Sequence, residues 1–218
     1  MEYRDSQTRH YDEGQIYFVT CNVKDWAPFF KEKIFCELFV AELKLAQELK
    51  EFELYGFCLN YSHFHLLIKP NQEHDLSKIM QFLKRNFSRC ANFILGYNND
   101  ELKQYVEMLK VSESDNNYCR FQKPQRLQKT QENYKKEFQE FNKKLLNLHH
   151  QFIQKHSNRN IPKFHWQKSF RDHVIRDRKD FENHHQYAMY NFLKHNLPQD
   201  WPYTSLNYPA MITLEIMW

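Results

Sequence analysis

The stretch YSHFHLLIKP, residues 61–70, places His63 and His65 two residues apart in an otherwise apolar segment. Side chains alternate between the two faces of a strand, so both imidazoles point to one side and Phe64 to the other. The apolar run from Leu66 to Ile68 then anchors the strand in a core. Two adjacent imidazoles can chelate a divalent cation. In a chain with 12 histidines, the alternative is a chance pair of half-exposed rings.

The segments before this stretch predict a β-hairpin, a further strand and a helix. ELYGFCLN (Glu53–Asn60) pairs with residues 63–70 across a tight turn, and GQIYFVTCNV (Gly14–Val23) is a further strand. A helix over Glu32–Phe52 comes between them. Its expected buried stripe is Ile34, Leu38, Ala41, Leu45 and Leu49.

Three more elements follow the hairpin. Asp75 is the expected N-cap of a helix that runs to Leu95. Its predicted buried stripe consists of Leu76, Ile79, Met80, Leu83, Phe87 and Ala91. Residues 163–176 predict a strand. Residues 177–196 predict a last helix, with Asp177 or Asp180 near its start and Pro198 just past its end.

The order of elements predicts an α+β fold, a ferredoxin-like antiparallel sheet with helices on one face. We expect residues 1–218 to form a single domain. A charged, mainly helical insertion interrupts it at about residues 97–162, and an aromatic, proline-rich tail occupies about residues 197–218.

Composition excludes several classes of protein. No run of 18 apolar residues is present, which argues against a membrane span. Five scattered cysteines without a CxxC pair favour reduced thiols and a cytoplasmic location. The net charge of +4 permits binding to nucleic acid without requiring it.

Two imidazoles leave a coordination sphere incomplete, and the last helix offers further groups. Tyr187 and Asn191 lie four residues apart, on one helix face. A carboxamide oxygen is a suitable ligand for Mg²⁺ or Mn²⁺, and a phenol beside that ion is a potential nucleophile. With 13 tyrosines in the chain, Tyr187 can equally be a packing aromatic.

Four blocks in order resemble the IS200-like tyrosine (Y1, HUH) transposases, most closely their REP-associated branch. They are HFHLLIKP, WQKSFRDHVIR, DFENHHQYAMYNFLKHNLP and DWPYTSL. The resemblance implies that His63, His65 and Asn191 bind the catalytic Mg²⁺ or Mn²⁺ and that Tyr187 is the nucleophile, with Tyr190 as fallback. Phe192 stands where this branch usually has proline, and the insertion is longer than in compact members.

The same resemblance implies the activity. The expected protein is a transposase that cleaves single-stranded DNA near hairpins through a covalent 5′-phosphotyrosine, as a monomer or homodimer. Basic and aromatic side chains that can contact the DNA occur on the second helix and the late strand. These candidates are Lys78, Lys84, Arg85, Arg89, Trp166, Lys168, Arg171, His173 and Arg176.

Three other functions fit the same residues. One is a non-catalytic protein that binds hairpin DNA and derives from such a transposase. Another is a metal-dependent hydrolase in which water attacks and no adduct forms. The last is an interaction protein whose charged insertion binds a partner. His173 can also be a hydrogen-bonded core histidine, and His184 shares a helix face with Tyr187 better than His185 does.

Overall fold

The structure, a computed structural model, describes residue 11 and residues 14–97, 131–157 and 160–214. The N-terminal decapeptide, residues 98–130 of the predicted insertion and the last four residues of the tail lie outside this part. The chain forms two compact units. Unit 1 comprises Met1–Asn86 and His165–Trp218, and unit 2 comprises Phe87–Phe164.

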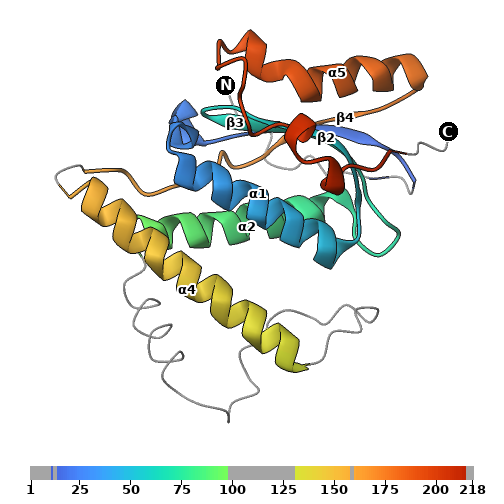
Figure 1. Cartoon of the computed structure of the whole chain (residues 1–218). Helices are drawn as coiled ribbons and strands as arrows, with labels where there is room; N and C mark the ends of the chain where they lie inside the picture. Colours follow the sequence, from blue (N-terminus) through green and yellow to red (C-terminus); the bar gives the residue numbers. More distant parts are fainter. Residues whose placement is uncertain (1–10, 12–13, 98–130, 158–159, 215–218) are drawn as a thin grey trace. The chain divides into compact units, whose positions relative to one another are not determined.

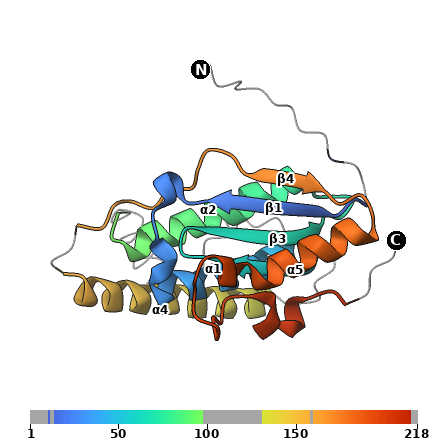
Figure 2. The same cartoon turned by 90° about the horizontal axis from the view of Figure 1, so that it is seen from above.

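A four-stranded antiparallel sheet forms the centre of unit 1 (Figure 2). Its strand order is β2-β3-β1-β4. The strands are β1 (Tyr17–Asn22), β2 (Glu53–Leu59), β3 (His63–Lys69) and β4 (Arg171–Val174). The central strands β3 and β1 pair so that Thr20 lies opposite His65. The predicted ferredoxin-like α+β fold is confirmed, and so is the hairpin of β2 and β3.

Helices cover both faces of the sheet, and not one face as the sequence suggested (Figure 1). On one face α1 (Lys33–Lys50) packs Phe39 against Phe64 of β3, with ring centroids 4.7 Å apart. On the other face, α5 (Arg178–Lys194) packs Ala188 and Phe181 onto the side of the sheet that carries the histidines. Among the helices that the structure describes, α5 is the one that packs on this face.

The buried face was predicted correctly for one helix and only in part for another. All six residues of the stripe expected on α2 (Leu76–Ile94) are buried, and Asp75 caps the helix by accepting from the Lys78 amide at 2.8 Å. Helix α1 forms as expected, but of its predicted buried stripe only Leu38 is fully buried: Ile34, Leu45 and Leu49 are partly buried and Ala41 is exposed. The core instead takes residues about one position later, among them Phe35, Phe39, Leu43 and Ala46. Large aromatic side chains bury more apolar area than the predicted stripe does.

The late strand is shorter than predicted. Regular pairing with β1 is confined to β4, and residues before it make one bridge, Trp166 with Val23. The chain after α5 returns along the outer edge of β2, where the Leu59 amide donates to the Tyr203 carbonyl at 2.9 Å. Trp201 and Tyr203 are buried there, so the tail protects an otherwise open sheet edge.

Unit 2 contains the end of α2 and the helix α4 (Gln131–Lys155), which fits the predicted helical character of the insertion. Asn92 bonds the Phe164 backbone through both ends of its carboxamide, at 2.8 and 3.1 Å. The Tyr97 hydroxyl donates to the Ile161 carbonyl at 2.6 Å. Among the described residues, no helix is both long enough and apolar enough to cross a bilayer.

Candidate active site

The two imidazoles of β3 lie side by side beneath α5. His63 and His65 are each only 4% exposed, and their ring centroids are 4.9 Å apart. The strand register places them on the face opposite Phe64, as the alternation predicted. Polar rings this deeply buried need partners, because an unsatisfied buried nitrogen is destabilising.

Each imidazole has one nitrogen held by the protein and one without a partner among the described residues. His65 Nδ1 lies 2.8 Å from the Thr20 hydroxyl, and His63 Nε2 lies 3.1 Å from the Asn60 carboxamide nitrogen. His63 Nδ1, His65 Nε2 and Asn191 Nδ2 are buried without a hydrogen-bond partner. Such orphaned polar atoms are typical of a site that takes a ligand.

Asn191 reaches this pair from α5. Its side chain is 1% exposed, and its Oδ1 accepts from Asn60 Nδ2 at 2.9 Å. Burial lowers the pKa of His63 and of His65, and the nearby Asn191 side chain offsets part of that effect on both, so it lies beside the two rings. A carboxamide oxygen has two lone pairs, so one remains available beside the two imidazoles.

Burial keeps both rings neutral near neutral pH. It lowers the pKa of His63 to about 4 and that of His65 to about 3, and repulsion from neighbouring histidines acts in the same direction. Neutral imidazole is the form that ligates a metal. Two imidazoles and one carboxamide oxygen therefore fit a divalent cation, and positions remain open for water or substrate.

Tyr187 lies beside the pair. Its ring is half-buried, 5.1 Å from the His65 ring and 5.6 Å from the Phe18 ring. Lys194 is the last residue of α5, and its Nζ lies 4.3 Å from the Tyr187 ring centroid. Tyr190, the fallback nucleophile, is 44% exposed. Of the two tyrosines, Tyr187 is the one that the structure brings to the imidazoles.

A glycine permits this close approach of helix and sheet. Gly56 lies in β2 where the register with β3 shifts. A Cβ atom there would lie 3.4 Å from Ala188 Cβ and 3.5 Å from His185 Cδ2. Small residues on both elements thus set the depth at which α5 sits, and with it the positions of Tyr187 and Asn191.

Sequence reasoning missed four residues of the site: Thr20, Asn60, Lys194 and His195. The His195 ring lies 4.6 Å from the His63 ring. Asn60 precedes His63 by three residues, so its place at the turn was a usable signal. Thr20 was not recognisable before the register of β1 and β3 was known.

Comparisons with known proteins give the family context of this geometry. Residues 15–108 match the family described as "Transposase IS200 like", a range that contains the histidine pair. The predicted resemblance to the IS200-like tyrosine transposases is confirmed. A protein of Haemophilus influenzae named "Putative REP-associated tyrosine transposase" is 26% identical over 203 residues, which cover 91% of this chain and 84% of the relative.

One solved structure shares the fold of this chain. It is described as a REP-associated tyrosine transposase bound to a REP hairpin, and its TM-score is 0.55 at 15% identity. The match covers all of this chain and 92% of the other. The range that matches the IS200-like family ends before Tyr187 and Asn191, so these two residues rest on the geometry given above.

The basic residues predicted to contact DNA differ in how far their side chains are engaged within the protein. Lys84 donates its Nζ to the carbonyls of Gln167 and Ser169, at 2.9 and 3.4 Å. Trp166 is 9% exposed, and its Nε1 donates to the Lys84 carbonyl. Lys78 is exposed and pairs with Asp75. The remaining basic candidates are exposed: Arg85, Arg89, Lys168, Arg171 and Arg176.

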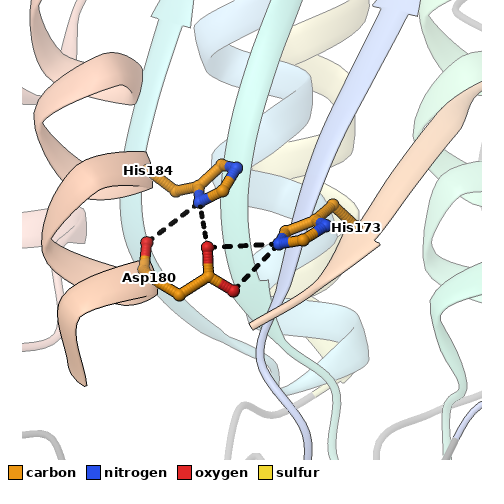
Figure 3. A group of neighbouring side chains, drawn as sticks. All are labelled: His173, Asp180 and His184. Carbon is orange, nitrogen blue, oxygen red and sulfur yellow. Dashed lines mark hydrogen bonds and ion pairs between the residues drawn. The ribbon is translucent and has the colours of Figure 1, made fainter. Parts of the chain in front are cut away.

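His173, the last candidate for a DNA contact, belongs to a second cluster where β4 meets α5 (Figure 3). Asp180 accepts from His173 Nε2 and from His184 Nδ1, each at 2.9 Å, and the two rings stack at 4.5 Å. The ligand atoms lie within 4.8 Å of one another, so the group can hold a metal ion.

The second cluster suits a cation less well than the histidine pair does. The Asp180 carboxylate also accepts from the Arg176 amide at 3.0 Å, so it is already shared among three donors. It lies in the first turn of α5, capped by Asp177, where the helix dipole favours negative charge. The cluster fastens the start of the helix to β4, and thereby helps to orient Tyr187.

Proposed function

We propose that this protein is a metal-dependent endonuclease and strand transferase that acts on single-stranded DNA near hairpins. The observation that carries the proposal is the approach of Tyr187 to His65, next to two buried ring nitrogens and Asn191. The relative named a REP-associated tyrosine transposase and the fold shared with a hairpin-bound one support it.

His63, His65 and Asn191 are proposed to hold Mg²⁺ or Mn²⁺. A cation bound there would supply charge neutralisation and polarisation of the scissile phosphate. Thr20 and Asn60 would orient the two imidazoles, since partners behind ligand side chains fix their ring positions. In the neutral state that burial favours, each ring has one nitrogen with a lone pair, and that nitrogen is proposed to ligate the cation.

The chemistry is proposed to begin at Tyr187. Its Oη attacks the phosphorus, the bond from phosphorus to the 3′ oxygen breaks, and the phenol proton is lost to solvent. The downstream strand stays attached to Tyr187 through its 5′ phosphate, and the leaving 3′ oxygen takes up a proton from solvent to become a 3′-hydroxyl. Attack by another 3′-hydroxyl on the phosphotyrosine reverses the step, so no nucleotide cofactor is needed. Lys194, over the Tyr187 ring, would place positive charge beside the phosphate.

Trapping the covalent species tests the proposal. A DNA hairpin with single-stranded flanks carries a label at its 3′ end, because the downstream fragment is the one that becomes attached. With Mg²⁺ the unmodified protein should give a labelled band on a denaturing gel. Tyr187→Phe should give none while binding the hairpin normally, and Tyr190→Phe is the matched control that keeps the band.

Each other outcome contradicts one part of the proposal. An adduct that persists in Tyr187→Phe contradicts the assignment of the nucleophile. Binding without adduct or cleavage indicates a non-catalytic hairpin-binding protein. Cleavage without an adduct indicates a hydrolase in which water attacks.

A further inference from the structure

Trp26 differs from the other tryptophans that the structure describes. It is 56% exposed, whereas Trp166 and Trp201 are each 9% exposed. The indole nitrogens of those two donate to backbone carbonyls, of Lys84 and Leu59 respectively. A large apolar ring left in water forgoes the stabilisation that burial would give, so the exposure of Trp26 calls for an explanation.

The backbone at Trp26 is also unfavourable. Asp25 and Trp26 both have φ of 55°, the left-handed region. This conformation is unfavourable for a residue with a side chain, and a bulky aromatic is one of the least suited to it. Backbone hydrogen bonds before and after the turn hold it in place: the Lys24 amide donates to the His165 carbonyl at 2.8 Å, and the Phe30 amide donates to the Tyr61 carbonyl at 3.0 Å. Strain kept in this way is typical of functional positions.

The position of the indole connects it to the candidate active site. Its ring centroid lies 5.7 Å from that of His63, at an interplanar angle of 74°. The ring centroids of His63 and His65 lie 4.9 Å apart, and those of His65 and Tyr187 lie 5.1 Å apart. The exposed ring therefore adjoins the place where the proposed function holds the scissile phosphate.

We infer that Trp26 is a stacking platform for one unpaired base of the DNA strand, next to the scissile phosphate. Bases stack on exposed aromatic rings without much regard to sequence, and a base adjoining the phosphate lies within one nucleotide of the imidazoles. The inference deepens the proposed function, since it depends on a phosphate held at His63 and His65. It replaces Trp166, which is buried, as the aromatic contact to the strand.

Binding to matched probes tests this inference without cleavage. The proteins carry Tyr187→Phe, and the probes are a DNA hairpin with oligothymidylate flanks and the same hairpin with abasic flanks. Trp26→Gly should weaken binding to the first probe about tenfold, the equivalent of 1.4 kcal/mol and within the range for one stacked base. It should leave binding to the abasic probe unchanged. Trp26→Phe should stay within about threefold of the parent, and Leu206→Ala, at another exposed apolar residue, should match the parent.

A thermal melt supplies the second measurement. Glycine accepts the left-handed conformation, so Trp26→Gly should melt no lower than the parent even as it loses affinity. A merely structural role would lower both stability and affinity. The inference would be overturned if Trp26→Gly bound the thymidylate probe as tightly as the parent does. It would also be overturned if Trp26→Gly lost the same affinity for both probes, or if the parent bound neither probe. Adduct formation by the unmodified protein shows separately whether the proposed function holds.

Discussion

Replacing Gly56 with valine should misplace α5 and slow the formation of the tyrosine adduct. The position of a Cβ atom at residue 56 is already 3.4 Å from Ala188 Cβ and 3.5 Å from His185 Cδ2. A γ-carbon extends about 1.5 Å further, well inside the 3.5–4.0 Å at which carbon atoms pack best. The helix must therefore retreat by about 1 Å, or the strand must bend by a similar amount.

Two quantities follow from that displacement. Overpacking a core costs about 1–3 kcal/mol, which for a protein of this size lowers the melting temperature by roughly 2–12 °C. A misplacement of about 1 Å in a reacting group can slow a reaction about a hundredfold. Adduct formation on the hairpin probe should therefore fall by one to two orders of magnitude at a temperature where the variant is fully folded.

A control separates position from stability. Ala46 is buried on α1, on the other face of the sheet from α5 (Figure 1), so Ala46→Val should lower the melting temperature to a similar degree but leave the adduct rate within about threefold. If Gly56→Val melts lower and still forms adduct at the parent rate, the close packing of α5 does not set the geometry of the site.

Three further predictions concern the candidate metal site and the thiols. Asn191→Ala should lower the affinity for Mn²⁺ measured by calorimetry, whereas Asn191→Asp should raise it by adding a charge; equal affinities in both variants would remove Asn191 from the ligand set. Because burial holds the pKa of His63 at about 4 and of His65 at about 3, below the usual 6.5, the unfolded chain binds more protons between pH 6.5 and 4. The metal-free protein should therefore lose stability as the pH falls through that window, and a melting temperature that is flat there would contradict the burial argument. Burial raises the pKa of Cys58 to about 12 and of Cys21 to about 11, so a thiol reagent at pH 8 should modify both only after unfolding, as peptide mapping would show.

The order of the elements along the chain and the placement of the histidines on one strand face were accessible from the sequence because they depend on short-range patterns. Alternation along β3 fixes which residues share a face, and this holds for His63 and His65 whatever the tertiary structure. The stripe of α2 was equally clear, since no competing apolar stripe exists there. On α1, two apolar stripes one residue apart compete, and only the packing of Phe35 and Phe39 decides between them.

The rest of the site depends on long-range pairing. That Thr20 supports His65 follows from the register of β1 with β3, which no local pattern specifies. The burial of Trp166 and the binding of Lys84 to backbone carbonyls likewise follow from segments about 80 residues apart that meet in unit 1. Charge and aromatic content along the chain indicated a DNA-binding surface but could not tell an available side chain from an engaged one.

The division of the chain into units has an implication for how such a protein can diversify. The imidazoles come from before residue 87 and the phenol and carboxamide from after residue 164, yet all of them belong to unit 1. In the sequence, unit 2 lies between these two segments of unit 1. A change in the length or charge of unit 2 therefore leaves the sequence of every residue of the candidate site intact.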